Sequence, residues 1–228
     1  MSLLRRLLRK SLSGSLSLSG ETSARLKHSF SRQHLAAAAY FARRSADIEA
    51  SLVAPNEDEK SQHRAYVTGT ILSAVAFLES SVNEFYLEAV DNNKNTLGSL
   101  SDSAVSSLAS AWPQVESLEI LEKFQKALNI ASLPQFNKGN PPFQDAASLV
   151  KLRNALVHYK SEWDDQAIVH SSLKQRLAVR FKPNPYAPTG SLWFPHLCLG
   201  AGCASWSVDT ATSFLHEFCS RMTIPRRY

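Results

Sequence analysis

Apolar and polar residues alternate with a helical period through most of the chain after about residue 30. Between Glu59 and Asn92, apolar side chains recur at alternating steps of four and three, which is the spacing of a helix packed against antiparallel neighbours. The pattern predicts one long helix that forms the spine of a bundle. Its expected seam consists of Ile71, Val75, Leu78, Val82, Phe85 and Ala89.

Shorter helices are predicted on both sides of this spine. Pro55, Asn56 and the acids that follow are typical of one helix ending and the next beginning. Pro141 and Pro142 are tolerated in a first helical turn and introduce a helix that includes residues 149–163. The other predicted helices span 32–52, 101–112, 115–130, 164–179 and 202–222, with loops over 132–142 and 182–195. No internal repeat or strand pairing stands out, so the expected fold class is all-α, a helical bundle with a long central helix.

The first and last of these helices have apolar faces that a bundle would bury. Small side chains in the first helix predict a close helix contact. Its expected contact residues are Leu35, Ala39, Ala42, Ala46 and Ile48. In the last helix the residues expected to face inward are Trp206, Phe214, Leu215 and Phe218.

The long helix also carries a second stripe, which Glu79 and Asn83 interrupt. The apolar members of this stripe are Leu72, Ala76, Tyr86 and Val90. Burying an acid in such a stripe is costly unless the acid is paired or hydrogen-bonded. We expect Glu79 to pair with Arg153, within one chain or across a dimer, and so to hold the guanidinium in place. The alternative is that Glu79 reaches solvent at the edge of the stripe.

Candidate chemistry lies in the segment LVKLRNALVHYKSEW, residues 149–163. Successive residues of a helix advance by about 100°, so His158 falls nearly opposite the apolar stripe and Asn154 lies beside it one turn earlier. Arg153 lies on the shoulder between the two faces. The expected core stripe consists of Leu149, Leu152, Leu156 and Tyr159. The imidazole is therefore either in water or covered by a second surface, such as the same helix of a two-fold dimer.

Arg153, the polar Asn154 directly after it, and His158 five positions after Arg153 resemble the R-x4-6-H helix of the HEPN superfamily. The resemblance implies an all-helical domain over residues 30–228 and a homodimer in which two Arg/His pairs share one cleft. It further implies a metal-independent endoribonuclease that needs no cofactor. Most of the chain after about residue 30 also resembles uncharacterised bacterial proteins of this kind, including the helix start Cys203-Ala-Ser-Trp206, and this second likeness carries no known activity.

These three residues fit the cleavage of RNA by its own 2′-hydroxyl. His158 has the side chain to move a proton near neutral pH, and Arg153 has planar donors for the phosphoryl oxygens. Asn154 would orient the imidazole or the phosphate. Tyr159 and Trp163 could stack on bases, but the pattern favours Tyr159 in the core and Trp163 at the helix end.

Two classes of function follow. The first is a HEPN-like endoribonuclease, a toxin or defence effector restrained by an antitoxin or another regulatory protein. The second is a non-catalytic helical dimer that binds RNA, a nucleotide or protein partners.

The distribution of charge bears on this choice. The net charge is +5, but residues 1–32 alone carry +6, so the remaining 196 residues have a net charge of −1. A strongly basic face, the usual footprint of nucleic-acid binding, is therefore not indicated by the totals for the helical part.

Residues 1–29 form a Ser/Leu/Arg-rich segment with a single acid. One interpretation is a flexible basic tail that contacts RNA or another anionic surface. Another is a short interfacial amphipathic helix built from Leu3, Leu4, Leu7 and Leu8. The third is a start codon placed too early, which would leave the tail without a function.

Composition and motifs narrow the remaining classes of function. No stretch of 18 apolar residues exists, and the three cysteines lack the spacing of a metal site. No glycine-rich phosphate loop or Gly-x-Ser-x-Gly motif is present. We therefore expect a cytoplasmic protein with reduced thiols and neither a metal nor a nucleotide cofactor.

Overall fold

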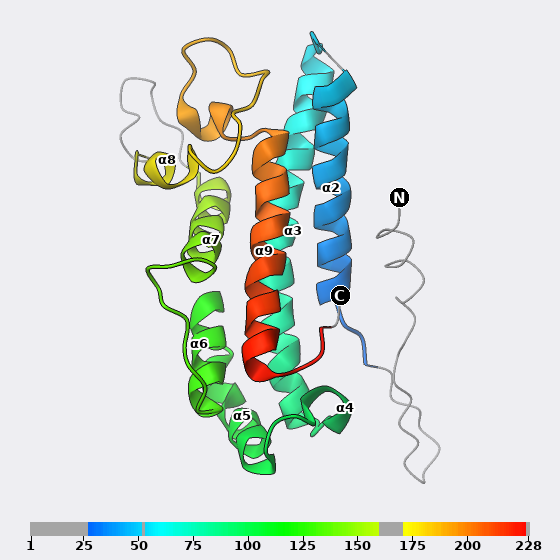
Figure 1. Cartoon of the computed structure of the whole chain (residues 1–228). Helices are drawn as coiled ribbons and strands as arrows, with labels where there is room; N and C mark the ends of the chain where they lie inside the picture. Colours follow the sequence, from blue (N-terminus) through cyan, green and yellow to red (C-terminus); the bar gives the residue numbers. More distant parts are fainter. Residues whose placement is uncertain (1–26, 52, 160–170, 227–228) are drawn as a thin grey trace.

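The computed structural model describes residues 27–51, 53–159 and 171–226, and within these ranges it is helical and contains no strand. Figure 1 shows the long helices α2, α3 and α9 lying side by side, with α6 and α7 following one another along the flank of α9. The elements are α2 (Ser31–Ser51), α3 (Glu57–Val90), α4 (Lys94–Leu97), α5 (Asp102–Val115), α6 (Ile120–Ile130), α7 (Phe143–Val157), α8 (Ser171–Leu177), the short irregular turn η2 (Trp193–Leu197) and α9 (Ala201–Met222). The predicted all-α fold class is confirmed.

The spine of the bundle is α3, which is 34 residues long. It begins with a capping box, in which the Asn56 side chain accepts from the Glu59 N–H and the Glu59 carboxylate accepts from the Asn56 N–H. All six residues of the predicted seam are buried. The helices α2, α5, α7 and α9 all pack against α3, so the periodicity identified the centre of the bundle correctly.

By length and composition alone, α3 is apolar enough to cross a membrane, and no other helix in the described ranges is. Its apolar side chains belong to the hydrophobic core shared with α2, α5, α6, α7 and α9. Helices at the centre of a globular bundle are expected to have this composition. The hydrophobicity of α3 is thus accounted for by its place in the bundle.

The face of α2 that packs on the bundle is rotated from the predicted one. Leu35, Ala42 and Ile48 are buried as expected, but Ala39 is only half-buried and Ala46 is exposed. Ala38 and Ser45 occupy the contact instead. The Ser45 hydroxyl donates to the Ala42 carbonyl oxygen at 2.8 Å. Because the hydroxyl is satisfied within its own helix, a polar residue can lie on the buried face.

The apolar face of α9 follows the prediction closely. Phe214, Leu215 and Phe218 are buried, whereas Trp206 is half-buried and its ring lies 5.6 Å from that of Phe181. Aromatic contacts hold this face to α6, since the ring of Phe124 lies 5.0 Å from Phe214 and 4.8 Å from Phe218.

The predicted helix break at Pro113 is wrong. Pro113 lies inside α5, which continues to Val115, and the Glu116 N–H donates to the Trp112 carbonyl oxygen at 2.9 Å. A proline in a helix loses its own N–H bond and crowds the carbonyl of the residue four positions earlier, but Pro113 is exposed and lies only two residues before the end of α5. The chain leaves the helical path over residues 116–119 instead, and α6 begins at Ile120.

Two predicted segments fall partly outside the described ranges. The predicted helix 164–179 is represented by the shorter α8, while Asp164 and Asp165 lie outside the described residues. Most of the predicted tail, residues 1–26, lies outside them as well. Lys27 is described, and its ammonium group pairs with Glu88 at 3.2 Å and with Asp91. This pairing neutralises acids at the C-terminal end of α3, where a helix favours cations.

Candidate functional site

Arg153, Asn154 and His158 lie together at the C-terminal end of α7. The buried face of this helix consists of Phe143, Ala146, Ser148, Leu149 and Leu152. Beyond Leu152 burial decreases, because Leu156 is half-buried and Val157 is 54% exposed. The three candidate residues therefore lie where α7 leaves the core.

The prediction that this helix continues through Trp163 is wrong. The helical conformation stops at Val157, and His158 is the C-cap, with φ −104° and ψ 26° and its N–H donating to the Asn154 carbonyl oxygen at 2.9 Å. Trp163 lies outside the described residues. The His158 side chain is exposed, as its expected position opposite the apolar stripe requires.

Tyr159 is the clearest departure from the predicted stripe. A continuing helix would have placed it above Leu152 in the core, but it follows the helix end and is 45% exposed. Its ring lies 6.0 Å from that of the buried Phe194, at an interplanar angle of 53°.

Arg153 is half-buried and lacks an electrostatic partner in the described part of the chain. Its Nε atom is buried without a hydrogen bond, and none of the ion pairs between described residues involves it. A buried guanidinium nitrogen without an acceptor costs free energy, typically about 1–3 kcal/mol.

The predicted pairing of Glu79 with Arg153 is wrong within one chain. Glu79 is exposed and takes part in none of the ion pairs just described. Asn83, one turn further along α3, binds a different cation, since its Oδ1 accepts from the ammonium group of Lys123 at 2.9 Å. The chain therefore does not bring the two supporting residues to Arg153.

Lys123 of α6 was missed by the sequence pattern, because lysines on amphipathic helices are usually solvated. It is 3% exposed and its ammonium group lies 5.9 Å from the ring centroid of Trp112. Its carbonyl oxygen accepts from the Tyr86 hydroxyl at 3.2 Å, and burial raises the pKa of Tyr86. No acid pairs with Lys123 among the described residues, so an amide oxygen and an aromatic ring balance its charge.

A second buried polar cluster, also missed, joins α2, α3 and α9. Glu49 Oε1 lies 2.8 Å from His63 Nε2 and accepts from the Ala201 N–H at 2.7 Å. His63 is 1% exposed, and its ring meets that of Tyr186 edge-on at 5.2 Å. The Tyr186 hydroxyl donates to the Ile48 carbonyl oxygen at 2.9 Å. Because His63 is enclosed, we interpret this cluster as a connection between helices.

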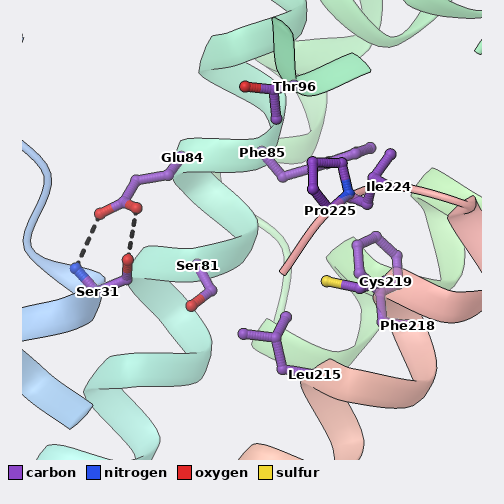
Figure 2. Close-up of a pocket in the computed structure, with 10 residues that line it drawn as sticks. All are labelled: Ser31, Ser81, Glu84, Phe85, Thr96, Leu215, Phe218, Cys219, Ile224 and Pro225. Atoms are coloured by element: carbon purple, nitrogen blue, oxygen red, sulfur yellow. Dashed lines mark hydrogen bonds between the residues drawn. The ribbon is translucent and has the colours of Figure 1, made fainter. Parts of the chain in front are cut away.

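A small cavity of about 40 Å³ lies between α3, α9 and the segment after α9. Figure 2 shows its lining of mainly apolar side chains, with Ser81, Thr96 and Glu84 at the edge. The Glu84 carboxylate accepts from the N–H groups of Phe30 and Ser31 at 2.9 Å and from the Ser31 hydroxyl at 2.6 Å. These bonds fix the start of α2, so Glu84 caps a helix.

The three cysteines are buried and form no disulfide. Burial raises the pKa of the Cys203 thiol to about 12 and also raises that of Cys198. Within the described ranges, no group of three or more His, Cys, Asp or Glu side chains is placed to hold a metal ion.

Comparisons with known protein families, with curated proteins and with solved structures found no match to this chain. The fold and the site together define an all-α bundle with an Arg/Asn/His group at the exposed end of one helix.

Proposed function

We propose that this protein is a metal-independent endoribonuclease of HEPN type, a toxin or defence effector of the cytoplasm. The observation that supports this most is the end of α7, where three candidate residues lie within a span of six positions. They are an Arg without an acidic partner among the described residues, a half-buried Asn and an exposed His. This set combines an anion-binding group with a proton-transfer group.

The reaction would be an attack by the 2′-hydroxyl on the adjacent phosphorus. His158 in its neutral form takes the proton of the 2′-hydroxyl as the new P–O bond forms. Arg153 donates to the phosphoryl oxygens, whose negative charge grows in the transition state. The bond to the 5′-oxygen then breaks, and this oxygen accepts a proton from a protonated imidazole. The products are a 2′,3′-cyclic phosphate and a 5′-hydroxyl.

A two-fold homodimer would complete this site. A second copy supplies a second His158, so that one imidazole acts as the base and the other as the acid. It could also supply an acid to Arg153, and Glu79 is the candidate because it is exposed and has no ion-pair partner among the described residues of its own chain. We therefore keep the pairing of Glu79 with Arg153 as a contact across the dimer.

The test is cleavage of a mixed RNA pool by the purified protein in excess chelator, beside His158→Ala and Arg153→Ala. We expect cutting by the wild type, products ending in 2′,3′-cyclic phosphate, and a loss of at least about 100-fold in each variant, the lower end of the effect of one proton-transfer group. His216→Ala is the matched control, because His216 is an exposed histidine on α9. Circular dichroism confirms that each variant is folded. Absence of cutting by the wild type, or equal cutting by all four proteins, would refute the proposal.

A second function is favoured by the charge distribution. Residues 33–228 have a net charge of −1, whereas nucleic-acid-binding domains usually carry a basic face. A non-catalytic helical dimer that binds RNA, a nucleotide or a regulatory protein through the same residues fits this balance. It predicts binding without cleavage in the same assay.

A further inference from the structure

Tyr159 is an exposed aromatic residue that directly follows the proposed proton-transfer residue His158 in the chain. Because α7 ends at Val157, the Tyr159 side chain does not join the core stripe predicted for a continuing helix. Nearly half of the tyrosine side chain, 45%, is exposed. Exposure of this size is unusual for an aromatic residue that the apolar pattern assigns to a core.

The ring is also held in place. Phe194 is buried in the hydrophobic core, and its centroid lies 6.0 Å from that of Tyr159. The interplanar angle of 53° means that the two rings meet at a tilt and are not stacked face to face. Phe194 therefore contacts the tyrosine ring without stacking face to face on it, and this contact reduces the side-chain entropy that would be lost when a base stacks on the ring.

We propose that Tyr159 binds an unpaired base of the RNA substrate by stacking, next to the phosphate that His158 and Arg153 act on. Every nucleobase has a π-face, so stacking tolerates sequence differences but requires a base that is free of a helix. Neighbouring Val157, 54% exposed, adds apolar surface at the same end of α7. The inference rests on the proposed ribonuclease function, because it assigns the substrate contact of that same site.

The test compares the wild type with Tyr159→Phe and Tyr159→Ala on a single-stranded oligoribonucleotide. Phenylalanine keeps the ring, so it should leave kcat and KM unchanged within about twofold. Alanine should raise KM about 5- to 150-fold with little change in kcat, the factor that corresponds to about 1–3 kcal/mol per stacked base. Tyr40→Ala is the matched control, because Tyr40 is a tyrosine of similar exposure, 41%, on α2.

A second measurement separates this inference from the ribonuclease itself. In the His158→Ala background, quenching of 2-aminopurine placed in the oligonucleotide reports stacking without cleavage. Loss of quenching with Tyr159→Ala, and not with Tyr159→Phe, supports the stacking contact. Cleavage by the wild type with equal KM and equal quenching in both variants overturns the contact and leaves the ribonuclease standing. Absence of both cleavage and binding by the wild type overturns both.

Discussion

Replacing Glu49 with alanine removes the acceptor that His63 shares with the first N–H group of α9. The Glu49 oxygen lies 2.8 Å from His63 Nε2 and 2.7 Å from the Ala201 nitrogen. Since His63 is 1% exposed, water cannot readily replace the lost carboxylate at the imidazole. The change should therefore leave a buried polar atom without a partner and loosen the join between α2, α3 and α9.

The size of the effect follows from these contacts. An unsatisfied buried donor costs about 1–3 kcal/mol, and an ordinary lost hydrogen bond about 1 kcal/mol. The Glu49 side chain is 21% exposed, which lets water reach part of the site and lowers the sum. We expect Glu49→Ala to reduce the free energy of unfolding by about 2–3 kcal/mol. Glu49→Gln retains an oxygen acceptor of the same shape and should cost about 1 kcal/mol.

Urea denaturation followed by circular dichroism measures this difference. With a urea dependence of about 3 kcal/mol per M, the midpoint of Glu49→Ala should fall by about 0.7–1 M. Glu116→Ala is the control, because this exposed glutamate forms no described ion pair, and surface changes of this kind stay within about 0.5 kcal/mol. A midpoint of Glu49→Ala equal to that of the control would show that the cluster does not join the helices.

Two other changes test the buried groups of the bundle. The Lys123 ammonium is buried and has no acidic partner among the described residues, so Lys123→Met, an apolar chain of similar length, should leave the free energy of unfolding unchanged or raise it. Asn83→Leu leaves that ammonium without its amide acceptor and should lower the free energy of unfolding by about 1–3 kcal/mol. Equal urea midpoints for both variants would contradict the interpretation that the Asn83 amide stabilises the buried Lys123 ammonium. The thiols of Cys198 and Cys203 should not react with iodoacetamide at pH 8 in the native protein, because burial raises the pKa of both and the thiolate is the reactive form. Both should be alkylated in denaturant, as mass spectrometry would show, and rapid native labelling of Cys203 would mean that α9 opens.

The apolar periodicity of the chain predicted most reliably those helix faces that are fully buried in the core. The seam of α3 was correct at all six positions because several helices pack against this helix. The second stripe is covered less completely, since Leu72 and Val90 are exposed. On α2 the same reasoning chose Ala39 and Ala46 in place of Ala38 and Ser45. Alanine and serine differ little in size, and only the position of the neighbouring helices decides which of them is covered.

Contacts between distant elements could not be predicted from the sequence. The Glu49 carboxylate binds an N–H group 152 positions away, and the Asn83 amide binds a lysine 40 positions away. An apolar pattern indicates which face of a helix is buried, but it does not identify the residues of other elements that pack against this face. For the same reason the pattern could not establish the pairing of Glu79 with Arg153, and the two do not pair within one chain.

The end of α7 changes the interpretation of the site most. Neither glycine nor proline follows Val157 among the next residues of the sequence, so nothing in the pattern indicated that the helix stops there. A helix continuing to Trp163 would bury Tyr159 and leave His158 as an isolated polar side chain on an outer face. Because the helix stops at Val157, the consecutive residues His158 and Tyr159 are both exposed, and His158 follows Asn154 by one turn. On the proposed function, this one helix end would provide a proton-transfer group in His158, an anion-binding group in Arg153 and a stacking surface in Tyr159.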